Sequence, residues 1–348
     1  MTNNSTTTDS KRYAWVDYAK GIAIILVVYR HLAYGLLAKG IEMPASIIAA
    51  NDMLYSFRMP LFFLLSGAFF VRSLSKRGEN SFVFNKINTL LYPYLLWAIV
   101  QITLQIVFSA YTNSSRTLAD YLDIFLQPRK LDQLWYLFAL FNVTILYLTV
   151  NLLTKGNKYI HLLIGLVFLG FSPTIREYSA LYDIMLHYIF FAVGDFGAKF
   201  FFQENVQQRL SNPQYLFFSF FVFIGLQFYY LFHQDMNMFL YLPIALYGCL
   251  FVIQLSSCLA ASNKLQFFRT IGHYSLYIYL LHVSIAAILR EILIRSGLTN
   301  GTILLVILIP SAISLSLLIY KCCVKFGFSF LFTGQFKVKQ RSKSVSLQ

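Results

Sequence analysis

The sequence predicts an all-α polytopic membrane protein with about ten transmembrane helices and both termini in the cytoplasm. Of the 348 residues, 58% are hydrophobic and 12% are charged, against about 25% charged residues in an ordinary soluble domain. The apolar residues gather in segments, most of them close to the roughly 20 residues that cross a bilayer as a helix. Lys and Arg gather in alternate connections. This composition excludes a soluble enzyme, a disordered chain and a disulfide-stabilised scaffold.

Ten apolar segments follow one another along the chain. The first is interrupted by Arg30 and His31 and lacks a convincing small-residue cleavage site, so we expect it to remain in the mature protein rather than act as a signal peptide. The fifth segment is the shortest. The ten predicted spans are 21–40, 54–71, 89–110, 134–153, 159–173, 181–198, 215–232, 237–260, 272–290 and 302–320.

Charge distribution predicts the orientation. With the termini inside, most of the 28 Lys and Arg residues fall in cytoplasmic segments, as the positive-inside rule requires. The formal net charge of +14 would suggest nucleic acid in a soluble protein, but here it is confined to one face, so we expect no nucleic-acid partner. The predicted organisation is a disordered cytoplasmic N-terminus over 1–11, a membrane domain over 12–325 and a basic cytoplasmic tail over 326–348. No metal site is predicted.

His31 is the strongest candidate for chemistry, because an ionisable group inside a span costs at least about 2.5 kcal/mol at the bilayer centre. It follows Lys20 by eleven residues, which leaves the two side chains about 20° apart on one helix face. The rise between them is about 16.5 Å. This spacing joins a cation at the cytoplasmic surface to an imidazole near the midplane. It is equally compatible with a histidine that only bonds to a neighbouring helix and a lysine that only anchors the span.

A second histidine repeats the arrangement. His282 lies ten residues after Gly272, just as His31 lies ten residues after Gly21. Both helices are predicted to run outward, so the two imidazoles should sit at a similar depth. Such a pair suits proton abstraction or relay, and a hydrogen bond between helices is the alternative for His282. Four further histidines lie near predicted span ends and are expected to be interfacial: His161, His187, His233 and His273.

The second segment opens with Phe57-Arg58-Met59-Pro60 and contains Ser66-Gly67. Proline is expected at the start of a helix, and Ser66-Gly67 permits a close helix contact. Arg58 either reaches the headgroups or acts in a site. The next inner connection carries a basic cluster suited to polyanionic phosphates, although the positive-inside bias alone would place several of these residues there. The cluster consists of Arg72, Lys76, Arg77 and Lys86.

Five motifs resemble those of the acyltransferase-3 family of integral membrane acyltransferases. Residues 17–28, followed by His31, are similar to the family's opening motif of a basic residue, ten residues and then His. Residues 57–67 are similar to its F-x-M-P-L-F-F-x-x-S-G segment. The resemblance is closest to the sugar O-acetyltransferase branch that includes fucose 4-O-acetylase-like proteins, and it runs from about residue 12 to about residue 320. The remaining motifs are KINTLLYPYLLW at 86–97, LWYL at 134–137 and SLYIYLLH at 275–282.

The resemblance implies a multi-pass protein of the bacterial cytoplasmic membrane, with residues 12–325 as its acyltransferase domain. It implies transfer of an acyl group, usually acetyl from cytoplasmic acetyl-CoA, to a hydroxyl of a cell-surface glycan or its lipid-linked precursor. His31 takes the place of the family's essential histidine, and Lys20 that of its partner cation. The family often carries Arg-x-x-Arg entering its third helix. Lys86 fits the first position, but Thr89 occupies the second, so Arg72, Lys76 or Arg77 is expected to supply the missing charge.

These expectations combine into one hypothesis. The CoA phosphates lie near Lys20 and the basic cluster, and the pantetheine arm follows the helix face to His31. His31 acts as general base or forms a covalent acyl-histidine, with His282 beside it. Candidates for stabilising the developing oxyanion are Arg30, Arg58 and Tyr279.

The acceptor is expected near Trp135 and Tyr136, with Ser66, because aromatic faces suit sugar rings. Trp135 and Tyr136 also fit an interfacial aromatic belt. Two alternatives remain open. One is the same fold with succinyl-CoA or another acyl donor. The other is a transporter or flippase of a lipid-linked glycan, with His31 and His282 as a proton path.

Overall fold

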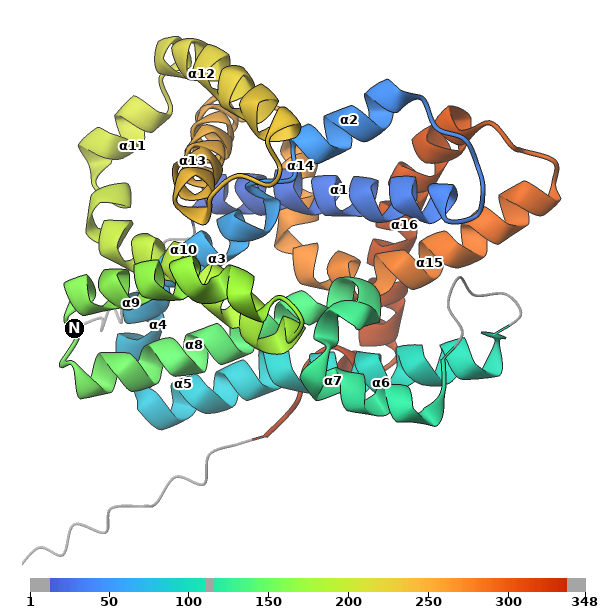
Figure 1. Ribbon diagram of the computed structural model, residues 1–348, viewed down its shortest axis with the longest axis horizontal. Helices are drawn as coiled ribbons and strands as arrows, with labels where there is room; N and C mark the ends of the chain where they lie inside the picture. The colour runs from blue at the N-terminus through green and yellow to red at the C-terminus, as the bar shows by residue number, and fades with distance from the viewer. Residues whose placement is uncertain (1–12, 110–115, 337–348) are drawn as a thin grey trace, which may run out of the picture.

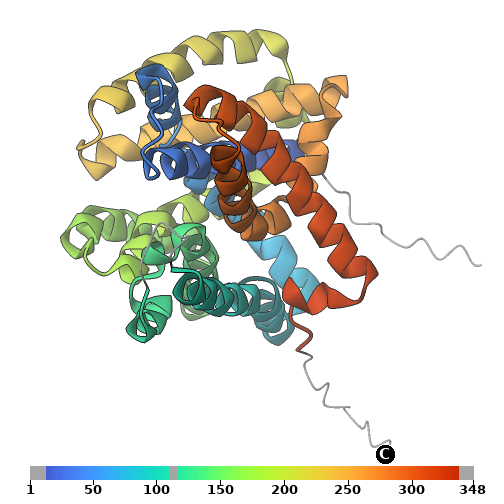
Figure 2. The ribbon, with the colours of Figure 1, turned by 90° about the vertical axis from the view of Figure 1, so that its right-hand side faces the viewer.

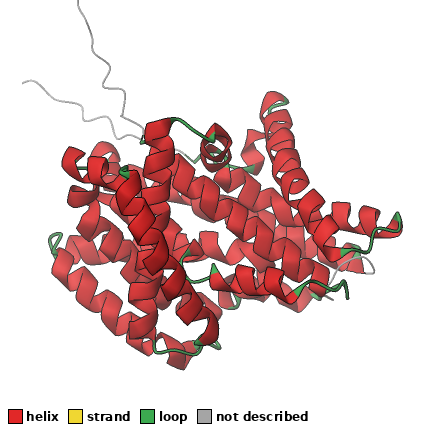
Figure 3. Ribbon diagram, turned by 90° about the horizontal axis from the view of Figure 1, so that it is seen from above, coloured by secondary structure: helices red, strands yellow, loops and turns green. Residues whose placement is uncertain are grey.

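The computed structural model describes residues 13–109 and 116–336, and within these ranges every regular element is a helix (Figure 1, Figure 3). The predicted N-terminal segment 1–11 and the distal part of the predicted tail, 337–348, lie outside the described residues. The α-helices are α1 (Ala14–Leu37), α2 (Ala45–Met53), α3 (Arg58–Ala68), α4 (Phe70–Arg77), α5 (Glu79–Lys86), α6 (Tyr92–Val107), α7 (Asp123–Leu126), α8 (Trp135–Leu153), α9 (Lys158–Phe171), α10 (Ser179–Phe201), α11 (Glu204–Leu210), α12 (Pro213–Phe232), α13 (Met238–Ser262), α14 (Gln266–His273), α15 (Ser275–Arg295) and α16 (Gly301–Lys325). The other helical turns are the π-helix η1 (Ile87–Leu91) and the 3₁₀ turns η3 (Leu118–Leu122), η4 (Pro128–Leu134), η5 (Ser172–Ile175) and η6 (Phe328–Leu331).

The helices confirm an all-α polytopic membrane architecture. Among the described residues, nine helical stretches are long and apolar enough to cross a membrane, or ten if a bent pair forms one span. That pair, Ala45–Ala68 and Phe70–Arg77, meets at an angle of 41° and corresponds to the predicted second segment. The second segment is therefore broken rather than straight. A break leaves backbone groups without helical partners, which protein groups must satisfy inside a membrane.

α1 is the central helix of the bundle. It packs against α3, α13, α14, α15 and α16, and Figure 1 shows it in blue, running from beside α13 across the red α16. Its inward faces carry small and branched apolar residues that are almost completely buried, such as Ala19, Ala23 and Val28. A helix surrounded in this way can hold polar groups away from lipid, which fits the presence of His31 on it.

α1 and α14 touch through a pair of facing glycines. A β-carbon on Gly21 would collide with the backbone carbonyl of Phe268, and one on Gly272 would collide with that of Asp17. Only glycine allows two helix backbones to come this close. The contact therefore fixes the position of α1 along α14, and with it the position of α1 relative to α15, which follows α14 in the chain.

A second facing pair joins α3 to α10. A β-carbon on Gly67 would meet the carbonyl of Phe191, and one on Gly194 would meet the carbonyl of Leu64. The close helix contact predicted at Ser66-Gly67 is present. It holds the broken second span against the long α10.

The chain after α16 returns to the start of α6 (Figure 2). Asn88, in the π-helix, accepts a hydrogen bond from Gly334 N on its carbonyl at 2.9 Å. Its side chain donates to Phe336 O at 2.8 Å and accepts from Phe336 N at 3.0 Å. Trp97 Nε1 donates to Leu331 O at 2.8 Å. This described part of the predicted tail is thus folded against α6.

Candidate active site

The two histidines of the repeated arrangement lie against each other. The ring centroids of His31 and His282 are 5.3 Å apart, with the ring planes at 62°. The contact of Gly21 with Gly272 explains this meeting. Each histidine lies ten residues beyond its glycine. α14 ends at His273 and α15 begins at Ser275, and α1 packs against both of them, which brings the two imidazoles together. The predicted common depth is confirmed.

The hydrogen bonds of His282 define which ring nitrogen carries the proton. Its Nδ1 lies 2.9 Å from Ile278 O and 3.0 Å from Tyr279 O. Carbonyl oxygens can only accept, so Nδ1 is the donor and Nε2 has the free lone pair. That Nε2 is buried and has no hydrogen-bond partner within residues 13–109 and 116–336. Buried polar atoms are rarely left unpaired, so this one calls for a reacting or binding partner.

His31 differs from His282 in its access. His282 is completely buried, whereas His31 is half-buried, and its ring makes no hydrogen bond to any described residue. Both ring nitrogens of His31 are therefore available. Of the two imidazoles, His31 is therefore the more accessible.

A line of aromatic rings connects the histidine pair to the start of α8. Ring centroids are 6.3 Å apart for His282 and Tyr279, 5.5 Å for Tyr279 and Tyr136, and 6.4 Å for Tyr136 and Trp135. The hydroxyl of Tyr279 is buried and makes no well-formed hydrogen bond among the described residues. The structure thus places Tyr279 beside His282, and it connects Tyr136 and then Trp135 to this tyrosine through successive ring contacts. Ser66 lies half-buried on α3. The predicted role of Trp135, Tyr136 and Ser66 in binding substrate stays a prediction, as does that of Tyr279 in stabilising the oxyanion.

Arg30 points toward α2. Its Nη1 lies 3.4 Å from Asp52 Oδ1, and its guanidinium carbon lies 4.3 Å from the ring centroid of Tyr55 and 4.5 Å from that of Tyr34. The sequence left this partner open, because Asp52 falls in what looks like a connection between spans. These contacts give Arg30 a place between an acid and two aromatic faces, about 100° around α1 from His31.

Arg58 fills the break between α2 and α3. Its Nη1 donates to Leu26 O of α1 at 2.8 Å, and its Nε donates to Leu54 O at 2.7 Å. Its Nη2 donates to the side-chain oxygen of Asn51 at 2.6 Å and to the backbone carbonyl of that residue. Because Arg58 is only 2% exposed, the alternative that it reaches the lipid headgroups is wrong. It donates hydrogen bonds to backbone carbonyls that have no helical partner at the break. Its bond to Leu26 O also connects the break to α1, five residues before His31.

Cations from three helices gather at the N-terminal end of α1. Lys86, half-buried at the end of α5, lies within electrostatic reach of Arg77 on α4 and Lys20 on α1. Arg72 and Lys76 are exposed one turn apart on α4. In the described part of the chain, no carboxylate lies within ion-pair distance of Arg72, Lys76, Arg77 or Lys86. Lys20, Arg77 and Lys86 therefore lie close together, and the predicted role of the cluster in binding phosphate stays a prediction.

Thr89 does not replace the second arginine of the family motif. Its hydroxyl donates to Asn85 O at 2.7 Å, within its own helix. The π-helix Ile87–Leu91 begins directly after Lys86 and changes the direction of the following side chains. Such insertions are frequent at functional sites, and nothing in a single sequence marks this one.

Sequence reasoning missed an ion pair next to Trp135. Arg129 Nε lies 2.9 Å from Asp183 Oδ1, and the Arg129 guanidinium lies 4.8 Å from the Trp135 ring centroid. His187 stands beside them, with its Nδ1 2.8 Å from Asp183 O. The expectation that His161 and His187 are interfacial is wrong, because both are buried between helices. Arg129 and Asp183 come from segments far apart in the chain, so no local pattern pairs them.

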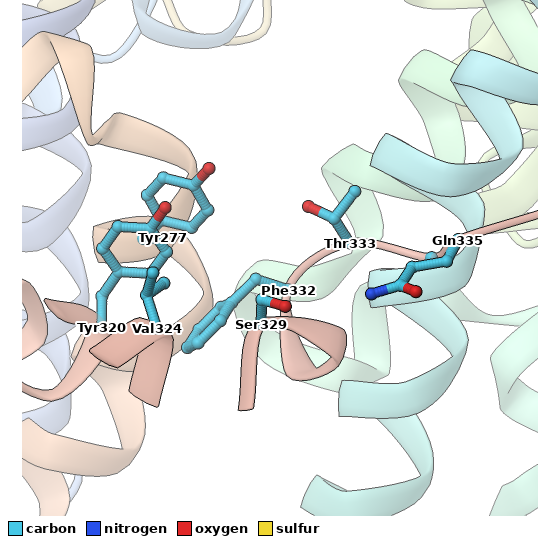
Figure 4. Close-up of a pocket in the computed structure, with 8 residues that line it drawn as sticks. Tyr277, Tyr320, Val324, Ser329, Phe332, Thr333 and Gln335 are labelled. Atoms are coloured by element: carbon cyan, nitrogen blue, oxygen red, sulfur yellow. The ribbon is translucent and has the colours of Figure 1, made fainter. Parts of the chain in front are cut away.

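A cavity of about 210 Å³ lies between α15, α16 and the C-terminal segment. Figure 4 shows the stacked rings of Tyr277 and Tyr320 on one side of it, and Thr333 and Gln335 on the other. Tyr277 precedes His282 by five residues, which places the two side chains about 140° apart around α15. The cavity thus faces away from the histidine pair.

Comparison with known proteins supports the resemblance in the motifs. A family model described as an acyltransferase domain, the acyltransferase-3 type, matches residues 13–321. Among curated proteins, the nodulation protein NolL of Mesorhizobium japonicum is 29% identical over 142 residues, which is 41% of this chain and 36% of that protein. The chain therefore matches little more than a third of this relative's length. No solved structure matches the chain.

Proposed function

The chain belongs to this acyltransferase family, and from that premise we propose that it transfers acetyl from cytoplasmic acetyl-CoA to a hydroxyl of a cell-surface glycan or its lipid-linked precursor. The observation that carries the proposal is the contact between His31 and His282, with an unpaired nitrogen buried on His282. Transfer to a hydroxyl needs a base that takes up its proton as the new bond forms. The proposed location is the cytoplasmic membrane of a bacterium, with the ends of the chain inside.

His31 is the proposed general base. The proton of His282 is on Nδ1, so its Nε2 can accept a hydrogen bond from the ring N–H of His31. The other nitrogen of His31 then faces the acceptor hydroxyl with its lone pair. The bond to His282 keeps His31 in this tautomer and stabilises the imidazolium that forms when the proton arrives, as the orienting partner of a catalytic histidine does.

The bond changes balance without any further reactant. The acceptor oxygen attacks the thioester carbonyl while His31 takes the hydroxyl proton, and a tetrahedral oxyanion forms. The carbon–sulfur bond then breaks, and His31 returns the proton to the leaving thiolate, which gives an ester and free CoA.

Tyr279 is the best placed of the three candidates for the oxyanion. Its hydroxyl is buried beside His282 and has a free donor. The guanidinium groups of Arg30 and Arg58 are engaged with Asp52 and with backbone carbonyls. We assign these two arginines to positioning rather than to the reaction itself.

The basic cluster is the proposed site for the phosphates of the donor. Lys20, Arg77 and Lys86 lie together at the N-terminal end of α1, and the latter two have no acidic partner among the described residues. The rise of about 16.5 Å from Lys20 to His31 is on the length scale of an extended pantetheine arm. The acceptor would approach along the Trp135 and Tyr136 rings, with Ser66 nearby.

The test is transfer by purified protein in lipid nanodiscs, measured as release of CoA thiol and as acetyl bound to a glycan acceptor. We expect His31→Ala to lower kcat/KM by about 10²–10⁴-fold, the usual contribution of a general base. His233→Ala, which alters an exposed histidine, is the matched control and should retain wild-type activity. Wild-type transfer by His31→Ala would overturn the proposal.

The same preparation separates the alternatives. Faster turnover with succinyl-CoA than with acetyl-CoA would keep the fold and change the donor. Movement of a lipid-linked glycan across proteoliposomes without consumption of CoA would instead favour a flippase. In that case the wild-type protein should show no transferase activity, and His31→Ala should reduce the flux of the glycan.

A further inference from the structure

A second group of cations lies at the edge of the bundle, away from the basic cluster. It surrounds a cavity of about 530 Å³ between the start of α9 and the end of α10. Lys155, Lys158 and Lys199 line this cavity, together with the aromatic rings of Tyr159 and Phe196. We propose that it binds the phosphate headgroup of an anionic phospholipid.

The position of the cavity is the depth at which lipid phosphates lie. One candidate span begins at Lys158 and another ends at Phe201, and the cavity sits where these two meet the water. Basic pockets between span ends are known sites for anionic headgroups. This placement depends only on the ends of the helices and holds for either orientation of the protein.

The charge of the cavity is positive and partly fixed in place. Lys158 Nζ lies 2.6 Å from Asp195 O and 3.2 Å from Asp195 Oδ1, while Tyr147 donates to the other carboxylate oxygen at 2.9 Å. Asp195 is almost completely buried, so it holds Lys158 but is shielded from a ligand. Lys155 and Lys199 are exposed and form no ion pair with a described residue. The rim therefore offers two cations that an external anion can neutralise.

The outer face of α9 explains why the ligand should be a lipid. Tyr159 is 74% exposed, Leu163 62% and Val167 48%, and these residues follow one another at four-residue intervals down one face of the helix. An acyl chain can lie along this face when the phosphate is at the lysines. The cavity also opens at the perimeter rather than toward His31, which separates it from the donor route.

Binding of phosphatidylglycerol to the detergent-purified full-length protein, followed by native mass spectrometry, tests the proposal. We expect the double variant Lys155→Gln/Lys199→Gln to weaken phosphatidylglycerol binding by about 30-fold, from the usual contribution of a lysine near an anionic lipid. The control Lys264→Gln/Lys325→Gln removes two exposed lysines elsewhere and should stay within about twofold of wild type. Phosphatidylcholine binding should be the same in all three proteins.

Two further measurements distinguish a lipid from a soluble phosphate. Leu163→Asn should weaken phosphatidylglycerol binding, because it interrupts the apolar face, without touching the lysines. Glycerol phosphate alone should bind far more weakly than the lipid. Equal binding of glycerol phosphate and the lipid, or wild-type lipid binding by Lys155→Gln/Lys199→Gln, would overturn the proposal. Transferase activity in neutral detergent should not change in these variants, so the outcome is independent of the proposed reaction.

Discussion

The two ends of the helix bundle differ in how their charges are neutralised. At the end that carries α2 and the α15–α16 connection, cations face carboxylates, as in Arg30–Asp52 at 3.4 Å and Lys39–Glu291 at 3.8 Å (Figure 1). At the end that carries α4 and α5, Lys158 pairs with the buried Asp195 at 3.2 Å, but Arg77 and Lys86 have no carboxylate within ion-pair distance among the described residues. Paired charges hold helices together, whereas like charges kept close without an acid need an anion from outside. The first end is held by ion pairs, and the second presents cations that the proposed function assigns to the phosphates of the donor.

The histidine pair lies between these two ends and belongs to neither pattern. Within the described part of the chain, no acid pairs with His282. Its Nδ1 is satisfied by backbone carbonyls, whereas its Nε2 has no partner there. An imidazole that is held on one side and open on the other can pass a proton without a large movement. In the proposed function, the two ends position the substrates and His31, in the middle of α1, supplies the base.

Among the ion pairs, the Arg129–Asp183 contact should contribute most to stability, so Arg129→Gln should lower the stability of the protein most. It leaves Asp183, which is almost completely buried, without its counter-charge, and removal of one partner of such a pair costs about 3 kcal/mol or more. The thermal midpoint in detergent should fall clearly. Arg129→Lys keeps the charge but loses the two-pronged contact, and it should fall between wild type and Arg129→Gln. Equal midpoints for all three proteins would contradict the structural role of this end.

Lys86→Gln, at the end that carries α4 and α5, should change substrate binding rather than stability. We expect KM for acetyl-CoA to rise by about tenfold with little change in kcat, because phosphate binding is the same in the ground and transition states. The thermal midpoint should not fall, since no buried acid loses its partner. Lys325→Gln, which alters an exposed lysine at the end of α16, is the control in the same steady-state assay. A lower kcat at unchanged KM would place Lys86 in the reaction instead.

Ionic strength should separate the two ends without any mutation. Raising salt from 0.1 to 1 M shortens the screening length from about 10 Å to about 3 Å. KM for acetyl-CoA should therefore rise several-fold, because the basic cluster is open to water. The buried Arg129–Asp183 contact is screened far less, so the thermal midpoint should change little over the same range. A KM that is insensitive to salt would argue against phosphate recognition by the cluster.

Arg295→Gln should have the smallest effect. Its Nε lies 2.9 Å from Glu291, but the Arg295 side chain is 63% exposed, and exposed pairs contribute about 0.5 kcal/mol or less. Chemical unfolding should show a change within that range. A loss as large as that of Arg129→Gln would mean that exposure does not govern how ion pairs stabilise this end.

Much of the fold was predictable because spans obey local rules. The expected span 134–153 corresponds to α8 (Trp135–Leu153), and the expected span 215–232 to α12 (Pro213–Phe232). The bend at Phe69 and the π-helix after Lys86 were not predictable, because both depend on which residues pack against the chain there. The meeting of His31 and His282 followed from equal distances to two glycines, which is a pattern a sequence does contain.

The sequence by itself determined the class of the protein, the approximate limits of its helices and the family, and it supplied the candidate site residues. These properties depend on hydrophobic length, charge and spacing along one helix. Only the tertiary structure decided that Arg58 is a buried clamp, that Arg30 pairs with Asp52, and that Arg129 pairs with Asp183. The physical reason is the same in each case. A buried charge must be matched by a group that the packing of distant helices brings within hydrogen-bond distance. The local sequence around the charge does not indicate which group that is.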